Sequence, residues 1–206
     1  MNILVVFPSH REAEHYTMPQ SAHSVSVHVS GVGVYNMVYN LTKMLATKSY
    51  DIIICAGIAG TFASEYSCGD VVCVSQDIFA DIGVTENQAF LSLADMGLEK
   101  YNEFPFTKGW LPLSYECNDF HSVSGITVNQ ITASKQKKQE LIEMYNPAIE
   151  SMEGAAAHYV SLQENVPCVH IRAISNEVGD RNKHNWCVTQ ACESLHHAIN
   201  TIINKL

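Results

Sequence analysis

The strongest constraint on the fold is a repeated change of hydrophobic periodicity along the chain. Short apolar runs that fit buried strands alternate with longer segments whose apolar residues recur every three or four positions, as in amphipathic helices. Strands that alternate with helices predict a mostly parallel or mixed sheet that is covered on both faces. The strand-like runs are residues 3–7, 51–56, 70–75 and 167–174, and the clearest helical segments are 34–45 and 188–206.

One α/β domain is expected to account for residues 1–206. This length is enough for a single domain with a substantial core, and the chain contains no internal repeat, low-complexity tract or linker. Ser134 can cap a helix that runs to Tyr145. Residues 85–118 have weak periodicity and are expected to form loops and short elements.

The charge balance argues against two classes of partner. The formal net charge is −9, whereas nucleic acids and anionic membranes attract clustered Lys and Arg. No apolar stretch reaches the roughly 20 residues that a bilayer-spanning helix needs. Residues 1–7 are interpreted as a buried first strand, not as a signal peptide. We therefore expect a cytoplasmic protein without nucleic-acid or membrane partners.

The cysteine pattern predicts thiols. The seven cysteines are odd in number and include no CxxC pair, and Cys55, Cys73 and Cys168 lie in apolar strand-like runs. Reduced core thiols are therefore expected in preference to a disulfide or zinc framework. The histidines are scattered, and the adjacent His196 and His197 point in different directions on a helix. Neither a metal nor an organic cofactor is expected.

Polar and glycine-rich segments follow the predicted strands. In open α/β folds the ligand lies beyond the carboxyl ends of the strands, so these segments are the candidates for a site. The glycines at 57–60 predict a tight turn, and those at 31 and 33 permit close backbone approach to a ligand. Glu153 can accept bonds from two ribose hydroxyls, although a helix-capping role would also explain it. The segments are 8–12, 30–33, 56–60, 127–129, 150–156 and 172–176.

Together these segments resemble the nucleoside phosphorylase/nucleosidase superfamily in order and spacing, over nearly the whole chain. The specific part is SMEGAA at 151–156 with RAISN at 172–176. Within the superfamily, GIAG, GITVN, ESMEGAA and RAISN, followed by an Arg-Asn pair and a Trp, resemble the futalosine hydrolases. The resemblance implies a nucleoside phosphorylase-like fold, a curved mixed β-sheet flanked by helices, and a homodimer. It also implies hydrolysis of the N-glycosidic bond of futalosine to hypoxanthine and dehypoxanthine futalosine, in menaquinone biosynthesis.

The resemblance also implies roles for individual residues. Glu12 matches the carboxylate that activates water, and Asn176 the group that stabilises the departing base; both are candidate catalytic residues. A purine nucleoside is the implied substrate, and Glu153 matches the residue that holds its ribose hydroxyls. The remaining candidate substrate-binding residues are Gly57, Ile58, Val128, Asn129, Met152 and Ser175.

Asn176 departs from one branch of the superfamily. Methylthioadenosine/S-adenosylhomocysteine nucleosidases carry Asp at this position, and Asp can protonate adenine N7, whereas Asn can only donate a hydrogen bond. Hypoxanthine offers acceptors at N7 and O6, so Asn176 favours a 6-oxopurine leaving group. A turned amide could still satisfy adenine. The proton source is then open, and Asp180 or a water is a candidate.

Scarcity of arginine favours water over phosphate as the nucleophile. A phosphate site usually holds several guanidinium groups, but the chain has only Arg11, Arg172 and Arg181, and no GxPxR segment follows the first strand. Two alternatives to a futalosine hydrolase remain. One is an adenine-releasing nucleosidase of the methylthioadenosine/S-adenosylhomocysteine type, and the other is a nucleoside-binding sensor that has lost catalysis.

Overall fold

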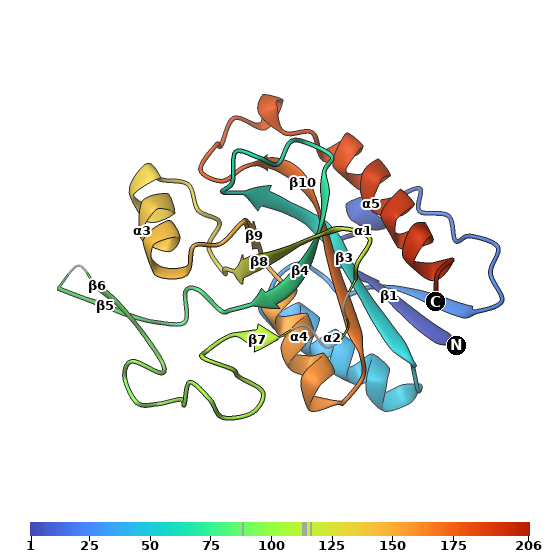
Figure 1. The fold of residues 1–206 in the computed structure, drawn as a ribbon, viewed down its shortest axis with the longest axis horizontal. Helices are drawn as coiled ribbons and strands as arrows, with labels where there is room; N and C mark the ends of the chain where they lie inside the picture. Colours follow the sequence, from blue (N-terminus) through green and yellow to red (C-terminus); the bar gives the residue numbers. More distant parts are fainter. Residues whose placement is uncertain (88, 113–114, 116) are drawn as a thin grey trace.

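A mixed eight-stranded sheet forms the centre of the molecule (Figure 1). The computed structural model describes residues 1–87, 89–112, 115 and 117–206. The strand order is β10-β4-β8-β9-β3-β1-β2, and β7 pairs with β4. The strands are β1 (Asn2–Phe7), β2 (Ser24–Val29), β3 (Ile52–Thr61), β4 (Val71–Asp77), β7 (Leu111–Pro112), β8 (His121–Thr127), β9 (Ile149–Ser151) and β10 (Cys168–Glu177).

The sheet curves until it closes on itself. β10 pairs in parallel with β3 and antiparallel with β4, so that β3, β10, β4, β8 and β9 form a ring. β1 and β2 extend the sheet from β3 in parallel. This arrangement confirms the expected single α/β domain with a curved mixed sheet.

Helices cover both faces of the sheet. The α-helices are α1 (His10–Ala13), α2 (Val34–Thr47), α3 (Lys135–Tyr145), α4 (Gly154–Gln163) and α5 (Val188–Ile203), and η1 (Lys183–Asn185) is a 3-10 turn. Along β1, Ile3, Val5 and Phe7 pack in a cluster with α5, whereas Leu4 and Val6 pack in a cluster with α2 and α4. Because both faces are buried, β1 is apolar at successive positions. The predicted cap at Ser134 is confirmed, since its side chain accepts a bond from the Lys137 N–H at 3.1 Å.

The prediction of a tight turn at residues 57–60 is wrong, because β3 continues to Thr61. Packing explains why glycine is needed in this extended strand. A Cβ on Gly57 would overlap the guanidinium of Arg172, and a Cβ on Gly60 would lie 2.9 Å from Val178 Cγ2 and 3.2 Å from Asn176 Nδ2. These glycines therefore leave space for side chains of β10 and the residues that follow it.

The weakly patterned stretch contains short elements, as expected. β5 (Gly83–Glu86) and β6 (Ala89–Ser92) form a separate two-stranded sheet that projects from the body of the molecule (Figure 1). In the part of the chain that the structure describes, no helix is long and apolar enough to cross a membrane.

The expectation of thiols at all seven cysteines is wrong for one pair. Cys68 and Cys187 form a disulfide, with Cα atoms 6.0 Å apart. They are separated by 119 residues, so their proximity depends on tertiary structure and leaves no spacing signal in the sequence. Cys55, Cys73 and Cys168 are buried in the core, as expected from their apolar surroundings.

Candidate active site

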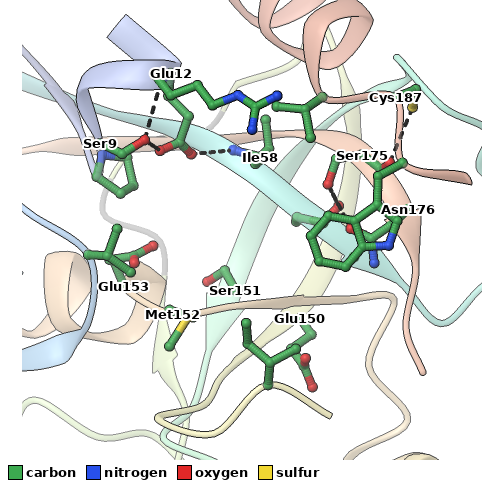
Figure 2. Close-up of a pocket in the computed structure, with 18 of the residues that line it drawn as sticks. Ser9, Glu12, Ile58, Glu150, Ser151, Met152, Glu153, Ser175, Asn176 and Cys187 are labelled. Atoms are coloured by element: carbon green, nitrogen blue, oxygen red, sulfur yellow. Dashed lines mark hydrogen bonds between the residues drawn. The ribbon is translucent and has the colours of Figure 1, made fainter. Parts of the chain in front are cut away.

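A cavity of about 700 Å³ lies beyond the carboxyl ends of β1 and β10 and beside β9 (Figure 2). Its volume is in the range of small-molecule sites in proteins. The wall brings together parts of five of the six segments that the sequence singled out: 8–12, 30–33, 56–60, 150–156 and 172–176. The wall is completed by Ile131, by Lys183 and by residues 186–190, which include the start of α5.

Glu12 is buried and both of its carboxylate oxygens are held. Ser9 is the N-cap of α1, so the fourth residue of the segment 9–12 turns back towards it. Glu12 Oε1 accepts a hydrogen bond from the Ile58 N–H at 3.0 Å, and Oε2 accepts one from the Ser9 hydroxyl. The carbonyl oxygen of Glu12 lies 2.7 Å from Nε2 of His196, which ties α1 to α5. The carboxylate is therefore fixed in position on the cavity wall.

Glu153 is the second buried carboxylate on the wall. It occupies the N-cap position of α4, but its side chain makes no hydrogen bond to the helix N-terminus. A helix-capping role therefore does not explain the glutamate at this position. Its Oε1 accepts a hydrogen bond from the Gly33 N–H at 2.9 Å. The backbone at residues 31–33 therefore approaches the Glu153 carboxylate closely, as glycine permits. Burial raises the pKa of Glu153, while Arg172 and the Gly33 N–H oppose that shift.

Arg172 lies next to both carboxylates, and its part in the site was missed from the sequence. Its side chain is fully buried, and Nη1 lies 3.4 Å from Glu153 Oε2. A Cβ on Gly57 would overlap the guanidinium and come within 3.0 Å of Glu12 Oε1, so Gly57 separates the guanidinium from the Glu12 carboxylate. The available signal was an arginine within an apolar strand, since a buried charge needs a partner.

A chain of buried hydrogen bonds through His170 and His158 fixes the position of Arg172. Arg172 Nε donates to His170 Nε2 at 2.7 Å, and His170 Nδ1 lies 3.1 Å from His158 Nε2. Arginine can only donate, so His170 is protonated at Nδ1 and donates onward to His158. His158 Nδ1 in turn lies 3.1 Å from the Leu111 carbonyl oxygen and donates to it. Burial lowers the pKa of His158 to about 4 and that of His170 well below its usual value, so both rings are neutral at pH 7.

Ser175 and Asn176 lie towards the other end of the cavity from Glu12 and Glu153 (Figure 2). The pairing of β10 with β3 shifts register between Ile174 and Asn176, and this irregularity lets two consecutive side chains face the cavity. Asn176 Oδ1 lies 2.8 Å from the Ser175 hydroxyl, and Nδ2 donates to the Glu177 carbonyl oxygen at 3.0 Å. These bonds set the amide orientation and leave one N–H of Nδ2 for a ligand.

The structure places six of the nine predicted site residues on the cavity wall: Glu12, Ile58, Met152, Glu153, Ser175 and Asn176. It does not place Gly57, Val128 or Asn129 there. Gly57 lies behind the guanidinium of Arg172, and Val128 is buried. Asn129 bonds instead to Asp81, with its Nδ2 2.9 Å from Oδ1. In this part of the chain it is Ile131 that lines the cavity, and no sequence pattern predicted it.

Asp180 does not fit the role of proton donor. It lies outside the cavity wall, and hydrogen bonds from the Asn185 side chain and the Asn182 N–H lower its pKa. A carboxyl group with a lowered pKa is ionised at neutral pH and has no proton to give. Of the two candidates for the proton source, a water remains.

The comparison with known families agrees with this geometry. A family model described as the phosphorylase superfamily matches residues 4–204. The chain belongs to the phosphorylase superfamily. This membership confirms the family resemblance that the glycine-rich segments, SMEGAA and RAISN indicated.

Two curated relatives and one solved structure show which members of the superfamily the chain is similar to. The chain is 25% identical to a futalosine hydrolase of Thermus thermophilus, over 84% of this chain and 79% of that protein. It is 29% identical to a futalosine hydrolase of Acidothermus cellulolyticus, over 82% of this chain and 71% of that protein. The structure of a futalosine hydrolase of Helicobacter pylori superposes with a TM-score of 0.83 at 15% identity, covering 100% of this chain and 98% of that one. At that identity, the superposition bears on the fold alone.

Proposed function

We propose that the protein hydrolyses the N-glycosidic bond of futalosine and releases hypoxanthine and dehypoxanthine futalosine. The observation that carries the proposal is one cavity with two buried carboxylates, Glu12 and Glu153, towards one end and an oriented amide donor, Asn176, towards the other. The similarity to futalosine hydrolases supports the choice of substrate.

In the proposed mechanism, Glu12 removes a proton from a water that approaches the anomeric carbon. The bonds from Ile58 and Ser9 aim this carboxylate before the substrate arrives. The water oxygen forms the new bond to the anomeric carbon, and the glycosidic bond breaks with its electron pair going to the base. Arg172 places a positive charge beside the two buried carboxylates and so offsets part of their negative charge in the cavity wall.

Glu153 is proposed to hold the ribose hydroxyls. Among the described residues, its Oε1 accepts the Gly33 N–H and its Oε2 has a 3.4 Å contact with Arg172, so the carboxylate retains acceptor capacity for two hydroxyl groups. Hydrogen bonds to both hydroxyls would hold the sugar in place while the anomeric carbon gains positive charge.

Asn176 is proposed to stabilise the leaving base. The N–H that remains on Nδ2 can donate to N7 or O6 of a 6-oxopurine, where negative charge develops as the bond breaks. Its orientation argues against the turned amide that adenine would need, because a turned amide would place Oδ1 against the Glu177 carbonyl oxygen. A water then supplies the proton that the base finally takes up.

Water as the nucleophile is supported by how the arginines are used. Arg172 is bound to Glu153 and His170, and the guanidinium of Arg181 lies over the Trp186 ring, 5.2 Å from its centroid. Among the described residues, Arg11 is the one arginine that lines the cavity wall. A single guanidinium is fewer than phosphate sites usually hold.

The experiment that tests the proposed function is product analysis by mass spectrometry. Purified protein is incubated in parallel with futalosine, inosine and methylthioadenosine, with and without phosphate. We expect hypoxanthine from futalosine, a free ribosyl product, and a rate indifferent to phosphate. A ribose 1-phosphate product would refute hydrolysis, and no base from any nucleoside would favour a nucleoside-binding sensor.

We also propose that the protein works as a homodimer in the cytoplasm, within menaquinone biosynthesis. Support for the dimer comes from exposed apolar side chains on and before α2: Val32, Tyr35 and Tyr39, with Val32 on the cavity wall itself. Light scattering coupled to gel filtration would test the oligomeric state, and Tyr35→Glu together with Tyr39→Glu should yield monomers if this face forms the interface.

A further inference from the structure

The proposed general base, Glu12, lies on a helix that is too short to hold it in place by itself. α1 contains four residues, His10–Ala13, and begins after the N-cap Ser9. Isolated helices of fewer than about 12 residues are marginal in water, and the last four carbonyl groups of a helix have no partner within it. The position of the Glu12 carboxylate therefore depends on contacts between α1 and the rest of the protein.

One such contact comes from His196 of α5. Its Nε2 lies 2.7 Å from the backbone carbonyl oxygen of Glu12. A carbonyl oxygen can only accept, so Nε2 carries a hydrogen and donates it. The Tyr16 N–H, which would bond to this carbonyl if α1 continued, bonds to the Ala13 carbonyl oxygen at 3.1 Å. His196 therefore takes the place of the missing helical turn.

The imidazole of His196 also packs against two aromatic rings that flank α1 in the sequence. Its ring centroid lies 5.9 Å from that of Phe7, at the end of β1, and 5.3 Å from that of Tyr16, which follows α1. Both contacts are edge-on, an arrangement that aromatic pairs prefer. The ring therefore contacts the chain both before and after the turn that carries Glu12.

α5 holds this segment at a second point on the same face. Asn200 lies four residues after His196, and residues four apart are neighbours on a helix surface. Its side chain accepts a bond from the Tyr16 hydroxyl at 3.1 Å and donates to the Thr17 carbonyl oxygen at 3.3 Å. The buried residues of α5 pack in one core cluster with β1 and β3. α5 is therefore a firm support for the bond to Glu12.

We infer that His196 is a positioning residue for the reaction: its Nε2–H fixes the turn that carries Glu12 and so keeps the general base aimed at the attacking water. The inference rests on the proposed function, since it names a residue that supports the same site. His196 lies outside the cavity wall and acts through the backbone of Glu12, whereas Ile58 and Ser9 hold its carboxylate. Ser9 belongs to the same turn, so a displaced backbone would carry the carboxylate away from the Ile58 N–H.

Three substitutions of His196 separate the hydrogen bond from the packing of the ring. His196→Gln keeps a donor, because Nε2 of glutamine lies the same number of bonds from Cα as Nε2 of histidine. His196→Asn carries the same amide but is one carbon shorter and cannot reach the carbonyl, and His196→Phe keeps an aromatic ring without a donor. His197→Phe is the matched control, since His197 is the exposed neighbour on the same helix.

The first measurement is kcat and KM for futalosine, together with the Tm of each variant. Loss of an interaction made only in the transition state lowers kcat and kcat/KM equally and leaves KM unchanged. A misplacement of about 1 Å can cost on the order of a hundredfold in rate, so kcat should fall roughly tenfold or more in His196→Phe and His196→Asn. KM should stay within about twofold of wild type, and His196→Gln and His197→Phe should keep kcat within about threefold.

Two results would overturn the inference. The first is wild-type kcat in a folded His196→Phe protein, which would show that the donor is dispensable. The second is an equal kcat in His196→Gln and His196→Asn, because these two variants differ in reach and both lack the ring. This pair decides the question even if His196→Phe does not fold.

A second measurement does not depend on turnover. Hydrogen–deuterium exchange, followed by mass spectrometry of peptides that contain residues 8–17, should be faster in His196→Asn than in His196→Gln, because the turn loses its anchor. Equal exchange in the two variants would contradict the positioning role. Protein that shows the expected difference but leaves futalosine intact would refute the proposed function, while the positioning of Glu12 by His196 stands.

Discussion

Adding one methyl group at Gly57 tests whether the position of Arg172 controls catalysis. A Cβ at Gly57 would overlap Arg172 Nη1 and lie 3.0 Å from Glu12 Oε1. Non-bonded carbon contacts are favourable at about 3.5–4.0 Å, so Gly57→Ala must displace the guanidinium by about 1 Å. The displacement cannot be absorbed easily, because His170 holds Nε and Glu153 holds Nη1.

The expected effect on activity is large relative to the effect on folding. A misplacement of about 1 Å in a catalytic site can cost on the order of a hundredfold in rate, which corresponds to about 2.7 kcal/mol of transition-state stabilisation. Overpacking a core costs typically about 1–3 kcal/mol, which predicts a Tm lower by roughly 2–12 °C for a chain of this size. The variant should therefore remain folded at 25 °C while kcat/KM on futalosine falls about a hundredfold.

The assay compares kcat/KM and Tm for wild type, Gly57→Ala and a control, Gly97→Ala. Gly97 has a φ of 72° and nothing within 4 Å of an added Cβ, so its substitution strains the backbone without touching the site. The control should lose some stability and keep its activity. Near wild-type kcat/KM in Gly57→Ala would refute the reasoning that the guanidinium must stay where the structure places it.

Three further predictions concern single groups of the site. Glu12→Gln keeps the contact with Ile58 but removes the carboxylate that takes the proton from water, so turnover should fall by about 10²–10⁴-fold. Binding of futalosine, measured by calorimetry, should stay largely intact. Normal turnover in this variant would remove Glu12 from the role of general base. Asn176→Asp introduces a carboxyl group that can protonate N7 of adenine. The ratio of adenine release from methylthioadenosine to hypoxanthine release from futalosine should therefore rise. An unchanged ratio would count against the assignment of Asn176. His158 has its pKa lowered to about 4 by burial, so unfolding takes up a proton between pH 4 and 6.5, and its contribution to stability is lost as the pH falls through that window. His158→Gln should flatten the dependence of the free energy of unfolding on pH over this range, measured by urea titration, and an equal slope in both proteins would contradict a neutral buried His158.

The sequence predicted those parts of the site that local pattern determines. Glu12 and Asn176 follow apolar runs at strand ends, where ligands of α/β folds gather, so position along the chain selected their segments, and the family resemblance then selected the two residues. Glu153 was selected in the same way, from an acidic residue at a strand-to-helix junction.

The parts that were missed depend on contacts between distant segments. Glycines at 57–60 indicate a turn locally, but in the folded chain they make room for the side chain of Arg172 and for Asn176, and β3 stays extended. Ile131 replaced the expected Asn129 on the cavity wall, because the loop after β8 has no periodicity that fixes which side chain faces inward. The disulfide between Cys68 and Cys187 likewise follows from tertiary packing, which spacing does not encode.

The most direct test of the account is the ratio of kcat/KM for hypoxanthine release from futalosine to that for adenine release from methylthioadenosine, measured on the wild-type protein in phosphate-free buffer. The oriented amide of Asn176 can donate a hydrogen bond but has no acidic proton, so we predict a ratio well above one, with free hypoxanthine as the base detected. A ratio below one would contradict the assignment of futalosine as the substrate and favour an adenine-releasing nucleosidase.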